Sequence, residues 1–291
     1  MKTEGGMKAP DFAYDRPETL DAALAALSAG GPDARLLAGG QSLMPMLNFR
    51  VAAPPLLIDI NRVPDLDGIE GAGDHVRIGA LARHAALEHS DLVAREIPLI
   101  HQVMPHIAHR AIRTRGTLGG SLALADPAAE LPACMVALDA IIIARSAKAK
   151  RRIAAGDFFR GVYETALAAD EMIVAVEVPK QAGRRHAFRE IARRHGDYAM
   201  VGLALTASGG AGVADARIVL FGVTDRPFRA VAAETSIAGL APGPEAGERA
   251  AAALDGTLEP HSDLNAPPDM KLHLAKVLLK RAVADLAGGV G

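Results

Sequence analysis

Cysteine and aromatic residues are scarce in this chain of 291 residues. Cys134 is the single cysteine, so no disulfide can form within the chain and no cysteine-ligated iron–sulfur cluster can be built inside it. Three tyrosines, seven phenylalanines and no tryptophan leave few aromatic faces on which nucleic-acid bases could stack. The composition therefore argues against a disulfide scaffold, an internal iron–sulfur protein and a base-stacking surface.

An excess of charge and long apolar runs are also lacking. Thirty-two basic and 34 acidic residues give a formal net charge of −2, which provides no general attraction to nucleic acid or to a membrane. No run approaches the roughly 20 apolar residues of a membrane-spanning helix. Residues 1–7 contain no apolar core of the kind found in secretory signals. We expect no nucleic-acid partner, no membrane span and a cytoplasmic location.

The usual nucleotide-binding motifs are absent, because the sequence has neither a Rossmann glycine fingerprint nor a Walker loop. It has instead two segments, residues 38–45 and 114–121, that combine paired glycines with small hydroxyl or amide side chains. Glycine lets backbone N–H groups approach an anion because no Cβ intervenes, and a helix N-terminus strengthens the attraction. Two converging loops of this kind could hold a diphosphate from both sides.

The hydrophobic pattern places both loops beside secondary structure. Strands predicted at 34–38 and 55–60 form a small α/β unit in which the first loop follows a strand, where ligands commonly bind. A helix predicted over 98–110 precedes the second loop. In the last third, a glycine-rich turn at 208–212 joins two strands, and a long helix is predicted over 263–286. These elements indicate a separate C-terminal α+β domain.

Four segments, taken in order, resemble the FAD-binding medium subunit of the molybdenum hydroxylases, the family of carbon monoxide dehydrogenase and of the flavin part of xanthine dehydrogenase. They are the first glycine loop, residues 113–120, residues 158–167 with Glu171 beyond them, and residues 193–199. The similarity runs from about Pro10 to the C-terminus.

The resemblance implies an α+β fold in three parts. An α/β FAD-binding region of the vanillyl-alcohol-oxidase-like type would comprise two subdomains, residues 1–60 and 61–180. A C-terminal α+β domain similar to that of the medium subunits would comprise residues 181–291.

The resemblance also implies a non-covalent FAD site. The residues that would wrap the diphosphate are Ala38, Gly39, Gly40, Gln41, Ser42 and Leu43 from the first loop, and Thr117, Leu118, Gly119, Gly120 and Ser121 from the second. Asp126 and Glu130 would bond to the FAD chain, whereas Leu167 and Tyr198 would lie at the isoalloxazine ring, on which an aromatic residue can stack. No catalytic residue is expected in this chain.

A metal site is not expected either. His101, His106 and His109 are close in sequence, and His106 and His109 share a helical face. No acidic or cysteine partner completes a recognisable metal site around them. We interpret them as solvated or packing histidines.

The chain departs from the family at two places. Many members have Asn where Ser121 stands, and they usually carry a lysine near Arg189 and Glu190, where this chain has none. Arg189 could supply the positive charge near the flavin, whereas Glu190 could not. Because charges near the ring tune the electronic properties of a flavin, this departure is expected to shift its redox potential.

The function that the resemblance implies is electron relay. Substrate would be oxidised at a molybdenum–pterin centre on a large subunit, and electrons would pass through [2Fe–2S] clusters on a small subunit to FAD and then to an external acceptor. The complex would be a dimer of heterotrimers. Two alternatives remain open. A free-standing flavoprotein oxidoreductase would need a further substrate domain, whereas a nucleotide-binding assembly protein without redox activity is favoured slightly by the missing lysine and asparagine.

Overall fold

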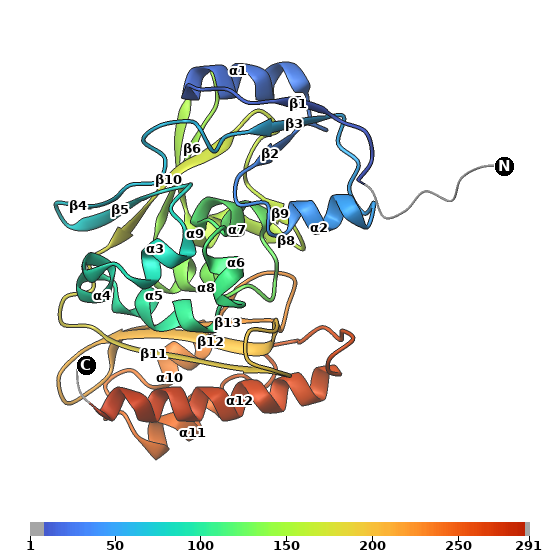
Figure 1. Cartoon of the computed structure of the whole chain (residues 1–291). Coiled ribbons are helices and arrows are strands. Elements are labelled where there is room, and N and C mark those ends of the chain that lie inside the picture. The colour runs from blue at the N-terminus through green and yellow to red at the C-terminus, as the bar shows by residue number, and fades with distance from the viewer. Residues whose placement is uncertain (1–8, 289–291) are drawn as a thin grey trace.

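The structure is a computed structural model, and it describes residues 9–288. Three main sheets and a small two-stranded one form within these residues, with the N-terminal unit at the top of Figure 1 and the C-terminal helices at the bottom. Mixed helices and strands give the α+β fold that the sequence predicts.

A three-stranded parallel sheet, of order β1–β3–β2, forms the N-terminal unit. Its elements are β1 (Ala13–Asp15), α1 (Leu20–Gly30), β2 (Arg35–Leu37), α2 (Leu43–Asn48) and β3 (Leu56–Asp59). Thr19 caps α1, because its hydroxyl accepts the N–H of Ala22 at 3.2 Å. The buried face of α1, which includes Leu24 and Leu27, packs with Ile58 of the sheet in one apolar cluster. This unit places the first glycine loop between β2 and α2.

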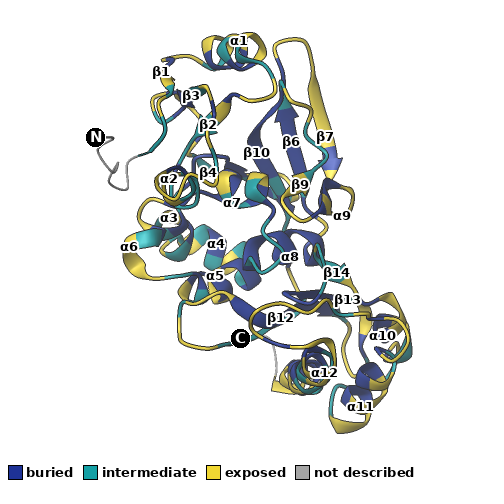
Figure 2. Cartoon of the chain, turned by 90° about the vertical axis from the view of Figure 1, so that its right-hand side faces the viewer, coloured by how far each residue is buried: buried dark blue, intermediate teal, exposed yellow. Residues whose placement is uncertain are grey.

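A five-stranded antiparallel sheet, of order β4–β5–β10–β6–β7, lies at the centre. Its strands are β4 (Ile69–Ala72), β5 (His75–Gly79), β6 (Ile141–Arg145), β7 (Lys150–Ala154) and β10 (Met172–Pro179). Neighbouring side chains of the middle strand β10 point into two different cores: Ala175 packs towards the N-terminal unit, and Val176 packs towards the helices. Figure 2 shows β6 and β10 as buried strands.

Helices and a small hairpin fill the space between this sheet and the next. They are α3 (His84–Glu88), α4 (Asp91–Glu96), α5 (Pro98–Val103), η1 (Met104–His106), α6 (Arg110–Arg113), α7 (Leu118–Leu124), α8 (Glu130–Ala137), α9 (Ala155–Phe158), β8 (Phe159–Gly161) and β9 (Glu164–Thr165). The single helix predicted over 98–110 is wrong. Pro105 lacks the N–H that would continue the helix, and Ala108 has a φ of +48°.

A four-stranded antiparallel sheet, of order β11–β12–β13–β14, forms the C-terminal part. Its elements are β11 (Arg185–Ala192), β12 (Ala199–Ser208), β13 (Ala214–Phe221), β14 (Phe228–Arg229), α10 (Val231–Ser236), α11 (Pro244–Ala252), α12 (Pro268–Asp285) and η2 (Leu286–Gly288). The helix predicted over 263–286 begins only at Pro268, because Pro267 and Pro268 disfavour a helical conformation in the residues before them.

Both faces of the C-terminal sheet are covered. Val201 and Leu203 pack with α12 and α11, whereas Ala204 and Phe221 join the core that surrounds α8 and α5. The sheet therefore lies between two helical layers (Figure 1). Within residues 9–288, no helix combines the length and the apolar character needed to cross a membrane.

Candidate functional site

The first glycine loop joins β2 to α2 and presents a row of backbone donors. Gly40 has a φ of +72°, in the left-handed region that glycine adopts without a steric penalty. The backbone N–H groups of residues 39–43 donate no hydrogen bond to any described residue. These five consecutive donors run into the first residue of α2, whose dipole adds positive potential at its N-terminus. The loop has the features of an anion cradle.

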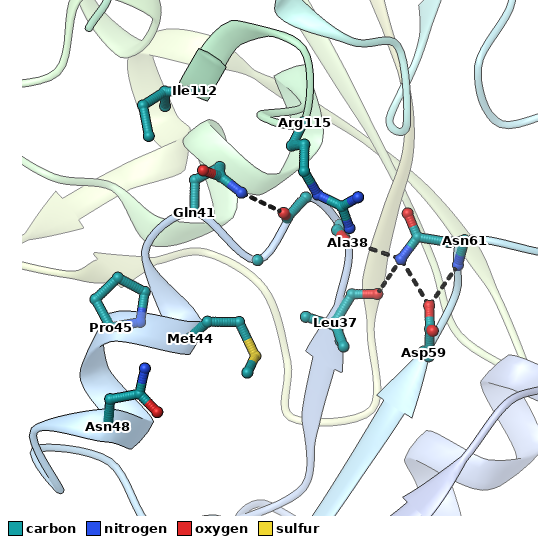
Figure 3. Close-up of a pocket in the computed structure, with 12 residues that line it drawn as sticks. Leu37, Ala38, Gln41, Met44, Pro45, Asn48, Asp59, Asn61, Ile112 and Arg115 are labelled. Carbon is teal, nitrogen blue, oxygen red and sulfur yellow. Dashed lines mark hydrogen bonds between the residues drawn. The ribbon is translucent and has the colours of Figure 1, made fainter. Parts of the chain in front are cut away.

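Asn61 fixes the start of this loop. Its Nδ2 donates to the carbonyl of Ala38 at 2.8 Å and to that of Leu37 at 3.3 Å (Figure 3). Its orientation is set by Asp59, whose Oδ1 accepts from Nδ2 at 2.6 Å and from the backbone N–H of Asn61 at 2.9 Å. Burial alone would raise the pKa of Asp59, but hydrogen bonds from Tyr14 and Asn61 outweigh burial and lower that pKa. Asp59 is therefore a firm anchor for Asn61.

A pocket of about 490 Å³ opens beside the loop. The end of β2, the loop itself and α2 line one side, and Ile112 and Arg115 line the other (Figure 3). A volume of this size is in the range of small-molecule sites. The pocket therefore brings the first glycine loop together with the segment that leads into the second.

The two glycine loops touch each other. A Cβ placed on Gly39 would lie 2.3 Å from the carbonyl oxygen of Arg115 and 3.0 Å from the Cα of Gly116. Such distances are far below normal contact, so the close approach of these two backbones requires glycine at position 39.

The second glycine loop uses its backbone donors inside the protein. The N–H of Leu118 donates to Ala82 O at 3.0 Å, and that of Gly119 donates to Ala80 O at 2.8 Å. The N–H of Gly120 donates to Thr117 Oγ1 at 3.1 Å, and that of Ser121 donates to Thr117 O at 3.1 Å. These four N–H groups therefore have acceptors within the protein, and their predicted contact with a diphosphate stays a prediction. A Cβ on Gly119 would lie 2.7 Å from Ala80 O, so this glycine allows α7 to pack on the backbone after β5. Contact of this loop with a cofactor through its remaining surface stays a prediction.

Asp126 lies at the far end of α7, between two tyrosines. α7 has seven residues and is therefore roughly 10 Å long. Asp126 accepts the N–H of Ala128 at 2.9 Å, and the hydroxyl of Tyr163 lies 3.5 Å from its Oδ2. Burial raises the pKa of Asp126. Partial burial, and then the negative charge of Asp126, raise the pKa of Tyr198. Tyr163 and Tyr198 are 59% and 62% exposed, so two aromatic rings border an open surface at this place.

Glu130 begins α8 and is buried beside a second carboxyl group. Burial raises its pKa to about 7, and the negative charge of Glu190 contributes to the rise. Glu190 has an Oε1 that lies 3.2 Å from His106 Nδ1 and a buried Oε2 without a partner among the described residues. The structure thus places two acidic side chains and an imidazole in one partly desolvated cluster.

Arg189 is not part of this cluster, and its predicted role in supplying positive charge near the flavin stays a prediction. Arg189 and Glu190 are adjacent on β11, so their side chains leave opposite faces of the sheet. Arg189 forms two hydrogen bonds with Asp285 of α12, at 2.7 and 2.8 Å, whereas Glu190 faces His106.

Leu167 is half-buried against the central core, and its N–H donates to Thr165 Oγ1 at 3.3 Å. Its predicted contact with the flavin stays a prediction. Within the part of the chain that the structure describes, no group of three or more His, Cys, Asp or Glu residues could hold a metal ion. His106 instead pairs with Glu190.

Sequence reasoning missed Asn61, Arg83 and Tyr163. Asn61 and Arg83 act through backbone carbonyls that are distant in sequence, and no motif marks such contacts. Tyr163 lies inside a segment that resembles the family, and its φ of +57° is unusual for an aromatic residue. An aromatic residue in a short glycine turn was the available signal for it.

A glycine cradle with free donors, a pocket and a distal aromatic pair define a protein that binds an elongated anionic cofactor. The family model described as the FAD binding domain in molybdopterin dehydrogenase matches residues 10–181. The model described as the CO dehydrogenase flavoprotein C-terminal domain matches residues 186–286. The chain belongs to the family of FAD-binding medium subunits of the molybdenum hydroxylases, and it is an oxidoreductase subunit that carries an FAD-binding domain.

Individual relatives agree over nearly the whole length. The glyceraldehyde dehydrogenase medium chain of Sulfolobus acidocaldarius is 35% identical over 97% of this chain and 100% of its own. The carbon monoxide dehydrogenase medium chain of Hydrogenophaga pseudoflava is 37% identical over 94% of this chain and 96% of its own.

Solved structures show the same fold. A structure of carbon monoxide dehydrogenase from Hydrogenophaga pseudoflava that lacks the Mo-pyranopterin moiety superposes with a TM-score of 0.93 at 37% identity, covering 97% of this chain and 99% of that one. Quinoline 2-oxidoreductase from Pseudomonas putida 86 gives a TM-score of 0.93 at 38% identity, with the same coverage.

Proposed function

We propose that this chain holds FAD non-covalently and passes electrons from iron–sulfur clusters on a partner subunit to an external acceptor. The observation that carries the proposal is the row of five backbone donors at residues 39–43, which have no hydrogen-bond partner among the described residues. The first three residues of the row line the pocket. Such a row fits the two phosphates of FAD.

The remaining site residues divide the work of binding. Ala38 to Leu43 would hold the diphosphate, with Thr117 to Ser121 facing it from the second loop. Asp126 and Glu130 would bond to the FAD chain, and Tyr198 and Leu167 would border the ring. When bound, FAD supplies the redox chemistry, and the protein supplies binding, orientation and electrostatic tuning.

The partners follow from what this chain lacks. Its single cysteine is buried within α8, where burial raises the pKa of the thiol, so it is poorly placed to ligate a cluster. We infer a small [2Fe–2S] subunit and a large molybdenum-cofactor subunit, assembled as a dimer of heterotrimers in the cytoplasm. The names of the relatives support this, since those given above are medium chains of dehydrogenases.

The test compares two glycine variants in the full chain reconstituted with FAD. Gly40 and Gly183 both have positive φ, +72° and +71°, so alanine at either site carries a similar backbone strain. Only Gly40 lies in the donor row. We expect Gly40→Ala to weaken FAD binding, measured by quenching of flavin fluorescence, and Gly183→Ala to bind as the wild type does.

Acid precipitation of the reconstituted protein should release all of the yellow colour, because the cofactor is not covalently attached. Colour retained in the pellet would contradict the non-covalent mode. A wild-type chain that never binds FAD would instead favour an assembly protein. Co-purification with large and small subunits separates the relay function from a free-standing flavoprotein.

A further inference from the structure

Arg83 stands between the two glycine loops and contacts both. It immediately precedes α3, with extended backbone angles of φ −72° and ψ 144°. Its Nη1 donates to the carbonyl of Arg115, at the entrance to the second loop. Its Nη2 donates to Asn61 Oδ1 at 2.7 Å. One guanidinium group thus links two segments that are distant in sequence.

The contact with Asn61 extends to the first loop. The amide of Asn61 accepts from Arg83 through its oxygen and donates through its nitrogen to Ala38 O at 2.8 Å. A continuous path therefore runs from the backbone of Arg115, through Arg83 and Asn61, to the backbone of Ala38.

The backbone of Arg83 is itself fixed to the second loop. Arg83 forms an antiparallel bridge with Thr117. The neighbouring hydrogen bonds run from His84 N to Gly116 O at 2.9 Å and from Leu118 N to Ala82 O at 3.0 Å. The side chain therefore reaches Asn61 from a base that cannot move independently of the second loop.

The loops are also held at a minimum distance. Gly39 already packs against the carbonyl of Arg115, so the two backbones cannot come closer. Arg83 binds that same carbonyl and prevents the opposite movement. The contact between Gly39 and the carbonyl of Arg115 therefore keeps the two loops from moving closer together, and the guanidinium of Arg83 keeps them from moving apart.

We propose that Arg83 is a positioning residue that sets the spacing of the two glycine loops before FAD binds. The inference rests on the proposed FAD site at these loops. Preset spacing lowers the conformational entropy that binding would otherwise cost, because one loop follows β2, the other lies between α6 and α7, and both would have to be ordered together. Arginine suits this role because its planar fork can serve two acceptors at once, whereas lysine offers a single compact charge.

The experiment measures FAD affinity of the full chain by flavin fluorescence for Arg83→Ala, Arg83→Lys, Asn61→Ala and the double variant Arg83→Ala with Asn61→Ala. Losing one charge-assisted hydrogen bond should weaken affinity by at least about tenfold. We expect this loss in all three single variants, including Arg83→Lys, which keeps the charge. The FAD affinity of the double variant should lie within about twofold of that of whichever single alanine variant binds FAD less tightly, because both residues act in one path.

Arg62→Ala is the matched control. Arg62 adjoins Asn61, is exposed, and pairs with Glu18 at 3.4 Å. It should bind FAD within about twofold of wild type. A second measurement needs no cofactor: amide hydrogen exchange of the protein without FAD should become faster at the hydrogen-bonded amides of the second loop in Arg83→Ala and stay unchanged in Arg62→Ala.

The outcomes separate the two levels of inference. If the wild type binds FAD and Arg83→Lys binds equally well, or if the effects of Arg83→Ala and Asn61→Ala are additive, the positioning role is overturned while the site stands. If the wild type does not bind FAD, the proposed site fails and the positioning role fails with it.

Discussion

Glu130 gives the protein a pH-dependent stability that one substitution should remove. Its pKa is raised from 4.5 to about 7 by burial, with a contribution from the charge of Glu190. The folded state therefore binds the proton more tightly than the unfolded state does. The resulting stabilisation is complete below about pH 4.5, falls as the pH rises, and is lost above about pH 7.

The size of the effect follows from the two proton affinities. A rise of the pKa from 4.5 to about 7 corresponds to about 3 kcal/mol, at about 1.4 kcal/mol for each tenfold change. Glu130→Gln keeps the shape of the side chain and removes its ionisation. We compare the free energy of unfolding of the variant minus that of wild type at two pH values. We expect this difference to be about 3 kcal/mol more positive at about pH 8 than at about pH 4.5, because only wild type loses stability as the pH rises.

The assay is urea unfolding of the full chain without FAD at these two pH values. Glu259→Gln is the control, because Glu259 is exposed and should show no such difference. The reasoning is refuted if wild type and Glu130→Gln differ by the same free energy at both pH values, since that result would mean that Glu130 is not buried as a neutral acid.

Two further substitutions test other parts of the site. Tyr198→Ala should shift the midpoint potential of bound FAD, measured by reductive titration, because a ring contact acts on the redox centre. It should weaken FAD binding less than Gly40→Ala does, because the diphosphate contacts supply most of the affinity. An unchanged potential together with a large loss of affinity would show that Tyr198 does not lie at the flavin ring. Arg113 donates two hydrogen bonds to the carboxylate of Glu88, from Nε at 2.8 Å and from Nη2 at 3.0 Å. Arg113→Ala should lower the free energy of unfolding in urea by roughly 3 kcal/mol or more, because it leaves the carboxylate of Glu88 partly buried without its partner. The exposed pair of Arg95 offers the comparison: Arg95→Ala should cost less than about 1 kcal/mol, and equal costs would show that the Arg113 pair is not desolvated.

The sequence predicted both glycine loops, but it could not predict what each glycine does. Gly40 has the positive φ that a cradle needs, as a glycine-rich pattern suggests. Gly39 is required by the carbonyl of Arg115, and Gly119 by the backbone of Ala80. These last two reasons depend on contacts between distant segments, which leave no local signal.

The orientation of Arg189 could not be predicted for a different reason. No strand was predicted over β11, so the alternation of side chains along a strand was not applied there. Phe188 belongs to the central core, and strand alternation then places Glu190 on that face and Arg189 on the other. Asn61 and Arg83 were missed because a side chain that binds a remote carbonyl has no characteristic neighbours in sequence.

The covered C-terminal sheet has a consequence for how this protein can be recombined. An antiparallel sheet often leaves one face in water, but here Phe221 lies across Gly202 and belongs to the core around α8. A Cβ on Gly202 would lie 2.0 Å from Phe221 Cζ. The segments on either side of residues 181–186 therefore share one interior, although they match separate family models. A chimera that joins halves of two relatives at this seam must match their facing side chains as closely as any single core, so the halves are inherited as a pair and not as interchangeable modules.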